Sequence, residues 1–513
     1  MSIVCQRLIR DGVAARTRGD IPAAERAFRA ALKADPRRAD VRRELAMALS
    51  LMGEADSALA EMRRALAARP HEAAWHHDLG ELLIRAGQTV YAIECFEKAA
   101  ELNPKEAMYP GRLAALQWRL RQRDVAVEWA QRALAIDPKQ EMARLTMVRV
   151  HLAEKDLGGA EEILKDLVED SRLKSTRCEA LHLLGTIREK QQRWGEAFDS
   201  HDAGNALMLP THAVQQALRL PIDAWLPHYT APGAAEKYAA WGRRTFDDGL
   251  PAPIVLTGFP RSGTTLVEQV LSAHPRLTTG DELPVNIKVV RRVAQMLDAM
   301  PSGTMLDRMD ALTDAQILEL RGMWWAALRG GIDPEEADRV IIDKHPLRVL
   351  SIGLINRLFP GAKIVVMIRD PRDVCISAMF QHFVVNPGMV RFLEQRLCGQ
   401  WYATVMGFWL TMRDMITVPW MELRYEDLVD DFHPHVRRML EFIGQPWDDA
   451  VERFHEHAAQ RVVLSASSEQ VTQKLHTRSV GKWKHFEDRI GPMTEILRPF
   501  VERLGYDDGA ASA

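Results

Sequence analysis

Hydrophobic and small residues recur at helical spacing through the first two hundred residues, and the pattern repeats every 34 residues. Prolines mark this period at Pro36, Pro70, Pro104 and Pro138. A second series keeps the same interval at Gly19, Gly53, Gly87, Arg121 and Lys155. Small residues follow five positions after each, at Ala24, Ala58, Ala92, Ala126 and Ala160. A fixed period of this length, with an apolar stripe at helical spacing, predicts a stack of helix pairs.

The repeated unit resembles the tetratricopeptide repeat family from Gly19 to about Pro138. A weaker copy without proline follows around residues 155–168, and residues 193–207 read as an atypical capping unit. The resemblance implies an all-α solenoid over residues 1–205, whose concave face binds a protein or an extended peptide. Packing between helices accounts for most of the large residues at helical spacing, so these residues do not by themselves indicate a peptide site. Self-association of the array and shielding of a neighbouring domain therefore stay open as alternatives.

The periodicity breaks down after Leu207, where Pro and Gly fall at irregular intervals. Residues 206–251 are therefore predicted to be a connector with one or two short helices. Apolar, β-prone runs then alternate with helical patterns, at residues 253–259, 339–343, 362–368 and 420–424. This alternation predicts an α/β domain with a central parallel sheet over residues 252–508. Ligands of such sheets bind at the carboxyl ends of the strands.

Charge and cysteine usage narrow the class of protein. The 513 residues carry 67 basic and 70 acidic side chains, with a formal net charge of −3. This balance offers no overall field for nucleic acid or an anionic membrane, so any anion site must be local. Five dispersed cysteines form no CxxC pair, which suits a reducing compartment. With no signal peptide and no apolar run of membrane-spanning length, the sequence predicts a cytoplasmic protein without a transmembrane segment.

The segment GFPRSGTTL has the outline of a phosphate-binding loop. Gly258 and Gly263 match the GxxxxG spacing, which lets backbone amides surround an anion at the start of a helix. The lysine that a nucleoside triphosphatase needs is replaced by Thr264. We therefore expect a smaller anion than ATP, with Arg261 supplying positive charge. An unrelated glycine turn remains the alternative.

A second anion site is predicted after the run at residues 362–368. Arg369 ends this run, and Ser377 follows about two turns into a helix that Pro371 would start. Both side chains can bind one further phosphate through charge-assisted hydrogen bonds. Two phosphate sites imply a nucleotide with two separate phosphoryl groups. Arg372 is expected on a solvated face.

These motifs resemble those of sulfotransferases that use 3′-phosphoadenosine 5′-phosphosulfate, abbreviated PAPS. The segment PRSGTTL looks like their 5′-phosphosulfate loop, with cofactor contacts from Pro260, Arg261, Ser262, Gly263, Thr264 and Thr265. Arg369 and Ser377 look like their 3′-phosphate motif. Over residues 253–491 the chain is most similar to the tyrosylprotein sulfotransferase branch.

The resemblance implies further roles. Glu282 lies 21 positions beyond Arg261, where that branch has its catalytic glutamate. Lys344 stands where the family has a lysine that contacts the sulfuryl group. Arg261 is expected to stabilise negative charge on the same group. Tyr425 matches a nucleotide-contacting tyrosine, and Ser468 and Lys482 match a serine and a lysine that close over the cofactor. His345 departs from the aspartate common in that branch and is a rival base.

The chemistry requires alignment and charge stabilisation, as in phosphoryl transfer, and the acceptor hydroxyl must lose its proton. No metal is expected, because the leaving nucleotide carries less charge than ATP, and the sequence accordingly shows no metal-ligand spacing. The resemblance implies a protein tyrosine as acceptor, although other hydroxyl compounds suit the same nucleotide site. Two alternatives remain: a nucleotide kinase or ATPase without the loop lysine, and a repeat-based interaction scaffold with an inactive nucleotide domain. The sequence predicts no oligomeric state.

Overall fold

The structure is a computed structural model that describes residues 3–220, 223–280, 282, 285–300, 303–383, 385–460 and 475–507. The chain divides into two compact units, Met1–Ser171 and Arg172–Ala513. The chain boundaries expected at residues 205 and 251 remain predictions.

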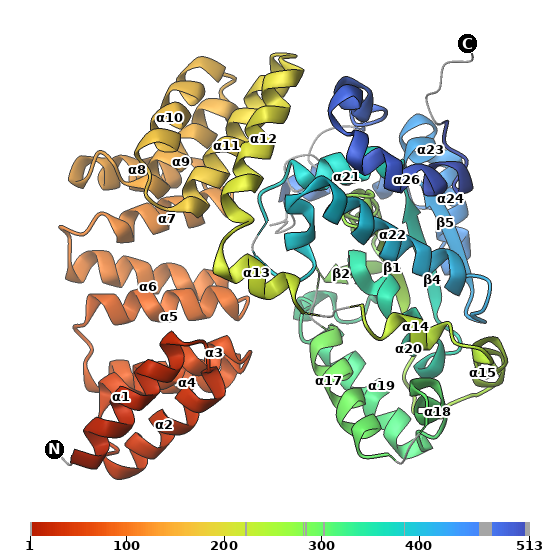
Figure 1. Cartoon of the computed structure of the whole chain (residues 1–513), viewed down its shortest axis with the longest axis horizontal. Helices are drawn as coiled ribbons and strands as arrows, with labels where there is room; N and C mark the ends of the chain where they lie inside the picture. Colours follow the sequence, from red (N-terminus) through yellow and green to blue (C-terminus); the bar gives the residue numbers. More distant parts are fainter. Residues whose placement is uncertain are drawn as a thin grey trace. The chain divides into compact units, whose positions relative to one another are not determined.

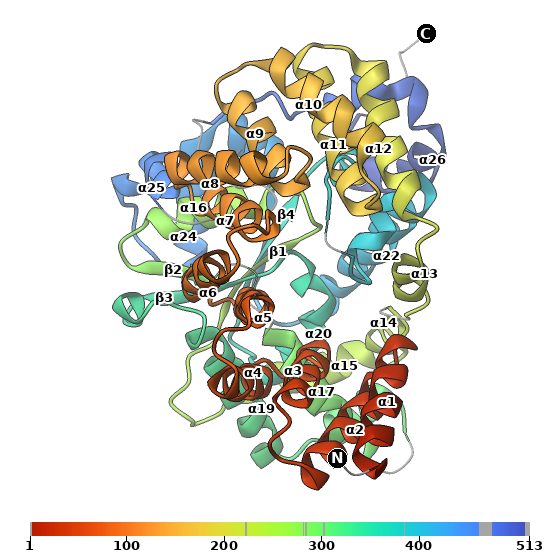
Figure 2. The same cartoon turned by 90° about the vertical axis from the view of Figure 1, so that its left-hand side faces the viewer.

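The N-terminal unit consists of helices that pair as antiparallel hairpins, stacked one on the next (Figures 1 and 2). Its helices are α1 (Ile3–Thr17), α2 (Ile21–Ala34), α3 (Ala39–Leu51), α4 (Ala55–Ala68), α5 (Ala73–Arg85), α6 (Thr89–Leu102), α7 (Met108–Arg119), α8 (Arg123–Ile136), α9 (Glu141–Ala153) and α10 (Leu157–Asp170). Each of the four periodic prolines lies two residues beyond the end of an even-numbered helix. Proline there cannot continue the helix, which fixes where each hairpin ends.

Left-handed backbone turns join the two helices of each hairpin. Gly19, Gly53 and Gly87 have φ values of 81°, 79° and 76°. Arg121 and Lys155 occupy the same repeat position and adopt the same conformation, with φ values of 62° and 64°. Because a side chain is disfavoured there, these two residues are held in place by the packing of the helices that they join.

Small and large residues alternate across the helix pairs. A Cβ atom added at Gly12 would lie 2.6 Å from the Phe28 ring, and one added at Gly80 would lie 2.7 Å from the Phe96 ring. Phe28 and Phe96 are fully buried. The predicted stripe therefore forms the core between the helices, where close approach requires a residue without a side chain.

The C-terminal unit contains helices on both faces of a five-stranded sheet (Figure 1). Its strands are β1 (Ile254–Gly258), β2 (Leu277–Gly280), β3 (Val340–Lys344), β4 (Lys363–Ile368) and β5 (Trp420–Arg424). Its helices are α11 (Lys174–Lys190), α12 (Trp194–Met208), α13 (His212–Leu218), α14 (Leu226–Tyr229), α15 (Ala234–Gly242), α16 (Thr264–Ala273), α17 (Val285–Asp298), α18 (Met305–Asp310), α19 (Asp314–Arg329), α20 (Ile352–Leu358), α21 (Pro371–Met379), α22 (Gln395–Met412), α23 (Tyr425–Asp430), α24 (Phe432–Ile443), α25 (Phe454–Gln460) and α26 (Gly491–Arg503). Five short 3-10 helices complete the described part, η1 (Pro334–Glu336), η2 (Pro346–Ser351), η3 (Met389–Leu393), η4 (Asp449–Arg453) and η5 (Lys482–Arg489).

All strands run parallel, in the order β2-β3-β1-β4-β5. Val255 faces one hydrophobic core, and its neighbours Ile254 and Leu256 face another on the opposite side of the sheet. Strand β1 at the centre and its neighbour β4 are buried almost throughout. This confirms the predicted sheet covered on both faces, because strands buried on both sides read as continuous apolar runs.

Helices α11 and α12 form a hairpin that clusters with the C-terminal unit. Its turn residue Gln192, with φ 60°, lies 37 residues after Lys155, so the 34-residue period is broken here. The extra length is in α11, which has 17 residues where α9 has 13. Phe198 of α12 belongs to the same core as the sheet. The last repeat-like hairpin is therefore part of the core of this unit.

Two local expectations were incomplete. The connector contains three short helices, α13 to α15, where one or two were expected. Strand β2, with the sequence LTTG, was not foreseen, because four residues are too few to show a period.

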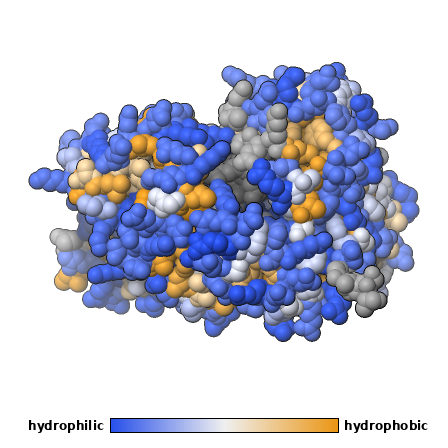
Figure 3. All heavy atoms as spheres, turned by 90° about the horizontal axis from the view of Figure 1, so that it is seen from above, coloured by the Kyte–Doolittle hydropathy of each residue, from blue (hydrophilic) through white to orange (hydrophobic). Residues whose placement is uncertain are grey.

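None of the helices in the described part of the chain is both long and apolar enough to cross a membrane. The face shown in Figure 3 is largely hydrophilic, interrupted by hydrophobic patches.

All five cysteines are free thiols. Four are buried, and Cys95 is half-buried. Burial raises the pKa of Cys95 to about 11 and that of Cys178 to about 12. These two side chains are therefore protonated thiols at neutral pH, as expected for inert cysteines.

Candidate functional site

The predicted site residues gather at the carboxyl edge of the sheet. The loop of residues 259–263 follows β1, and Glu282 lies two residues beyond the end of β2. Lys344 ends β3, Arg369 follows β4, and Tyr425 follows β5. Since the strands are parallel, all five strand ends meet at one edge. This is the position at which open α/β sheets bind ligands.

The loop after β1 leaves no room for side chains at its glycines. A Cβ atom at Gly258 would lie 2.7 Å from Ser262 Oγ, and one at Gly263 would lie 2.6 Å from the Tyr425 ring. Gly263 also has φ 105° and caps α16 without a side-chain hydrogen bond. The first amides of a helix lack intrahelical acceptors, so this end of α16 can receive an anion.

Ser262 adds a polar group to this cradle. Its hydroxyl oxygen is buried and has no hydrogen-bond partner within the described ranges. Buried polar atoms are nearly always paired, so such a hydroxyl points to a ligand. Thr264 and Thr265 are buried at the start of α16, and Pro260 is buried in the loop before it. The residues present therefore fit a phosphate or sulfate group.

The two predicted phosphate motifs are in direct contact. Arg261 Nε donates to Ser377 Oγ at 3.1 Å, and Arg369 Nη1 donates to the carbonyl oxygen of Arg261 at 3.0 Å. The Arg369 guanidinium also lies over the Tyr425 ring, 4.7 Å from its centroid. Ser377 lies on α21, whose first residue is Pro371, as the sequence predicted. The fold thus brings together four residues from three segments of the chain, which follow β1, β4 and β5.

Arg261 is held in an unusual environment. Burial, together with the nearby positive charge of Arg369, lowers its pKa to about 10, so it stays protonated at neutral pH. Its φ of 73° and the φ of 39° at Glu282 fall in the left-handed region. Backbone strain of this kind is concentrated at functional sites, and here it occurs at two residues selected by sequence alone.

Lys344 lies between two carboxylates. Its ammonium nitrogen is 3.1 Å from Glu282 Oε1 and 3.0 Å from Glu268 Oε2. The side chains of Lys344 and Glu268 are 0% and 3% exposed, whereas that of Glu282 is 44% exposed. Lys344 therefore has a buried partner and an accessible one. The accessible carboxylate is the one that a substrate can reach.

His345 has a local structural role. Its Nδ1 accepts a hydrogen bond from the backbone N–H of Leu347 at 3.2 Å, which caps the 3-10 helix η2. Burial, with Arg348 and Lys344 nearby, lowers the pKa of His345 to about 3. The ring is therefore neutral, and with Nδ1 accepting, the proton is assigned to Nε2.

Lys482 begins η5 and is held by acidic and aromatic neighbours. Its nitrogen lies 2.7 Å from Glu189 Oε2 and 5.5 Å from the centroid of the Phe380 ring. No contact joins it to Arg261 or Arg369 among the interactions of the described residues. Ser468, its predicted companion, lies outside the described residues.

The prediction for Arg372 was wrong. Its side chain is 2% exposed and pairs with Asp370 at 2.8 Å, and its guanidinium stacks on the Trp483 ring at 3.7 Å. Arg372 therefore belongs to the core of this unit. A solvated helix face was assumed because the sequence does not show that η5 covers α21.

Three acidic residues of the site were missed. Glu268 pairs with Lys344, Glu189 pairs with Lys482, and Asp373 accepts the backbone N–H groups of Gly481 and Trp483 at 2.7 and 2.8 Å. A glutamate within the apolar segment TTLVEQVLSA was a usable signal for Glu268, since a buried charge needs a partner. No comparable signal marks Glu189, which lies 293 residues from its partner.

Family models match both parts of the chain. Residues 253–449 match the model described as the sulfotransferase family. Tetratricopeptide repeat models match residues 15–75, 52–107 and 77–141. The chain joins tetratricopeptide repeats to a sulfotransferase-family domain. Both resemblances predicted from the sequence, to tetratricopeptide repeats and to sulfotransferases, are thereby confirmed. The sulfotransferase match includes Arg261, Lys344 and Arg369, whereas Lys482 lies beyond it.

Several proteins are similar to parts of this chain. An uncharacterized protein of Aquifex aeolicus is 27% identical over 351 residues, which cover 67% of this chain and 44% of the relative. Protein-tyrosine sulfotransferase A of Caenorhabditis elegans is 27% identical over 272 residues, covering 52% of this chain and 70% of the relative. Protein-tyrosine sulfotransferase 1 of Danio rerio is 29% identical over 269 residues, covering 50% and 73%. The chain spans less than half the length of the Aquifex relative.

Among the described residues, no cluster of three or more His, Cys, Asp or Glu side chains could hold a metal ion.

Proposed function

We propose that the protein transfers a sulfuryl group from PAPS to an acceptor hydroxyl. The observation that carries this proposal is the contact between the two predicted phosphate motifs. Arg261 reaches Ser377 at 3.1 Å, and Arg369 reaches the Arg261 carbonyl at 3.0 Å. A nucleotide that carries one phosphoryl group on its 3′ oxygen and another on its 5′ oxygen requires two phosphate sites, separated by no more than the length of one nucleoside.

The loop after β1 would bind the 5′-phosphosulfate. Its amides, the Ser262 hydroxyl and Arg261 supply donors, while the missing loop lysine disfavours a triphosphate. Arg369 and Ser377 would bind the 3′-phosphate through charge-assisted hydrogen bonds. Tyr425, with its ring beside Gly263 and under Arg369, would border the same nucleotide.

Transfer requires alignment, charge stabilisation and removal of one proton. The acceptor oxygen forms a bond to sulfur while the bond from sulfur to the 5′-phosphate oxygen breaks. Glu282 would take the proton of the acceptor hydroxyl. Arg261 and Lys344 would stabilise the negative charge on the transferred group and on the departing phosphate.

Glu282 is favoured over His345 as the base. The Glu282 carboxylate is partly exposed and lies 3.1 Å from the Lys344 ammonium. His345 has a pKa lowered to about 3, and its Nδ1 lone pair is used by the N–H of Leu347. A group with so low a pKa is a weak base at neutral pH.

We propose a protein tyrosine as the acceptor, because the relatives from Caenorhabditis elegans and Danio rerio are named protein-tyrosine sulfotransferases. Tetratricopeptide arrays commonly bind peptides on their concave face, which supports recruitment of the acceptor or of a partner by the N-terminal unit. A cytoplasmic location stays a prediction.

Nucleotide binding tests this function. Calorimetric titration with 3′,5′-adenosine bisphosphate is expected to give binding, and Mg-ATP is expected to bind much more weakly. Arg369→Ala should weaken binding of the bisphosphate by about 10-fold to 100-fold, because a charge-assisted hydrogen bond contributes about 1.5 to 3 kcal/mol. Arg413→Ala, which removes a partly exposed arginine paired with Glu422, is the control.

Binding of Mg-ATP in preference to the bisphosphate would contradict the proposal and support a kinase or ATPase. If binding is as expected, incubation with labelled PAPS and tyrosine-containing peptides should yield labelled peptide. Labelling of small phenols or carbohydrates alone would exclude the tyrosine acceptor.

A further inference from the structure

An ion pair connects the α11–α12 hairpin to the predicted nucleotide lysine. Glu189 lies in the last turn of α11, and its Oε2 is 2.7 Å from Lys482 Nζ. The side chains are 16% and 24% exposed. Partly buried pairs are screened less by salt than exposed pairs, so the carboxylate offsets much of the lysine's positive charge.

Glu189 is held in place from the hairpin side. His201 of α12 lies with Nε2 3.6 Å from Glu189 Oε1, and its ring stacks on Phe380 at a centroid distance of 4.1 Å. Burial raises the pKa of Glu189, but His201 and Lys482 outweigh it and keep that pKa below its ordinary value. Glu189 is therefore ionised at neutral pH.

The backbone around Lys482 is fixed without Glu189. Asp373 of α21 accepts the N–H groups of Gly481 and Trp483, the residues on either side of Lys482. Arg369 Nη2 donates to the carbonyl oxygen of Ser479 at 2.5 Å. Since these contacts place the segment, Glu189 acts on the direction and the charge of the lysine side chain alone.

We propose that Glu189 is an affinity-determining residue: its carboxylate competes with the nucleotide phosphate for the Lys482 ammonium. The inference rests on the proposed function and on the role that the sequence resemblance implies for Lys482, a lysine that closes over the cofactor. A phosphate that recruits Lys482 must weaken the pair with Glu189, so the α11–α12 hairpin and the nucleotide are coupled. The coupling is reciprocal, because two binding events that share one group alter each other's affinity by the same factor.

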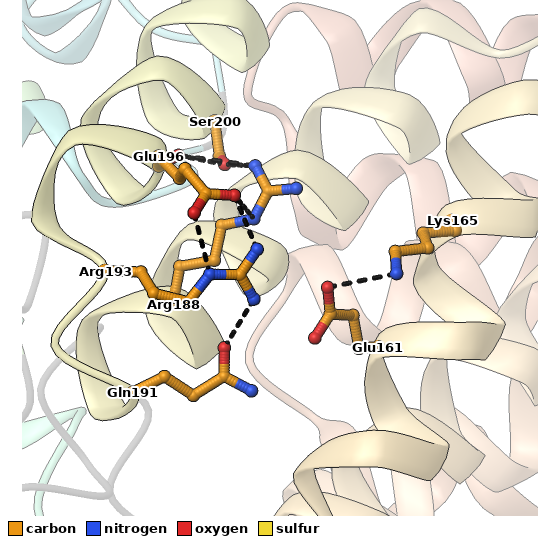
Figure 4. Close-up of polar contacts among 7 residues, drawn as sticks. All are labelled: Glu161, Lys165, Arg188, Gln191, Arg193, Glu196 and Ser200. Carbon is orange, nitrogen blue, oxygen red and sulfur yellow. Dashed lines mark hydrogen bonds and ion pairs between the residues drawn. The ribbon is translucent and has the colours of Figure 1, made fainter.

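The same hairpin provides a matched control. Figure 4 shows Arg193 with Glu196 and Gln191, and Arg188 with Ser200. Glu196 Oε1 accepts from Arg193 Nε at 2.8 Å, within the hairpin itself. Glu196→Gln removes one negative charge from α12 and leaves the Glu189–Lys482 pair intact.

The test measures the dissociation constant of 3′,5′-adenosine bisphosphate by calorimetry on the full chain. Glu189→Gln should bind about fivefold more tightly than the wild-type chain, the lower end of typical coupling. Glu196→Gln should bind like the wild-type chain. In a Lys482→Gln background, Glu189→Gln should bring no further gain, because the shared group is absent. Glu189→Asp serves as a second variant. Its side chain is one methylene shorter, which moves the carboxylate away from Lys482, so this variant should also bind the bisphosphate more tightly than the wild-type chain.

Unchanged or weaker binding by both Glu189 variants would overturn the proposal. A gain that persists in the Lys482→Gln background would also overturn it, since that gain would be a general effect of net charge. Failure of the wild-type chain to bind the bisphosphate would contradict the proposed function and this inference together. Wild-type binding without a gain in the Glu189 variants contradicts the inference alone.

Discussion

Lys344 shares its charge between a buried and an accessible carboxylate, and this arrangement gives two similar residues different roles. Glu268 is enclosed and can serve only as a counter-ion for the buried ammonium. Glu282 is exposed enough to meet an acceptor while its contact with the ammonium holds it beside Lys344. A buried ammonium without any counter-ion would be strongly destabilising.

Glu282→Gln tests the assignment of the base. The variant keeps the size and a hydrogen-bonding oxygen beside Lys344, so the affinity for 3′,5′-adenosine bisphosphate should change by less than about twofold. The rate of sulfuryl transfer should fall by about 10² to 10⁴, the usual contribution of a general base. Single-turnover transfer from labelled PAPS measures this rate.

His345→Asn is the companion variant, because the asparagine oxygen can still accept from the N–H of Leu347. It should retain most of the transfer activity. Full activity in Glu282→Gln together with loss in His345→Asn would transfer the role of base to the histidine.

Asp373 makes stability depend on pH. Burial raises the pKa of its carboxyl to about 6. Because this folded-state pKa is above that of an unfolded aspartate, the contribution of Asp373 to stability is full below about pH 4 and is lost as the pH rises through 6. Relative to Asp373→Asn, the wild-type chain should therefore lose on the order of 2 to 3 kcal/mol between about pH 4 and 7.

Calorimetric melting of both proteins across this pH range gives the comparison. Asp414→Asn, which removes a carboxylate that is 75% exposed, is the control for the loss of one negative charge. A difference between Asp373→Asn and the wild-type chain that does not vary with pH would contradict the assigned shift.

Helix hairpins of the N-terminal unit depend on one left-handed residue at each turn. Three turns use glycine, whereas Arg121 and Lys155 carry side chains in the same conformation. A non-glycine residue in the left-handed conformation costs about 1 to 2 kcal/mol. Glycine avoids this cost, but part of its advantage is lost because glycine makes the unfolded chain more flexible. The turns of the later repeats are therefore less favourable than those of the earlier ones.

Arg121→Gly and Lys155→Gly should each stabilise the N-terminal unit by about 0.5 kcal/mol. Gly87→Ala is the reverse control, since an added Cβ there would have no neighbour within 4 Å and only the backbone would be strained. It should destabilise by about 1 kcal/mol. Urea unfolding followed by circular dichroism measures the changes. Destabilisation by both glycine variants would mean that the arginine and lysine side chains contribute more than the turn conformation costs.

The division of the molecule differs from the division of its sequence motifs. Repeat-like periodicity suggested a boundary near residue 205, yet α11 and α12 cluster with the C-terminal unit, and Phe198 belongs to its core. Trp194 stacks on His485 at 3.9 Å, and Asp199 pairs with Arg489 at 2.8 Å. The hairpin is thus a repeat in sequence and a part of the C-terminal unit in packing.

Truncation distinguishes the two boundaries. A chain that begins at residue 172 should bind 3′,5′-adenosine bisphosphate with nearly wild-type affinity. A chain that begins at residue 206 should melt at least about 5 °C lower than the first, because loss of a buried phenylalanine alone costs about 3 to 5 kcal/mol. Scanning calorimetry of both chains, with and without the bisphosphate, provides the measurement. Equal stability of the two chains would favour the predicted boundary at residue 205.

The sequence alone determined the repeat period, the parallel sheet and the order of the polar motifs along it. These features are local: a proline stops a helix, an apolar run forms a buried strand, and GFPRSGTTL requires a tight turn before a helix. Because parallel strands end at one edge, the sequence order also predicted that Arg261, Lys344 and Arg369 lie near that edge.

Only the tertiary structure decided which charges meet. Glu189 with Lys482, Glu268 with Lys344, and the burial of Arg372 under Trp483 depend on helices that pack together from distant parts of the chain. The positions of paired charged side chains follow no period in the sequence. The energy of an ion pair also depends on how deeply the pair is buried, and this burial exists only once the whole unit is folded.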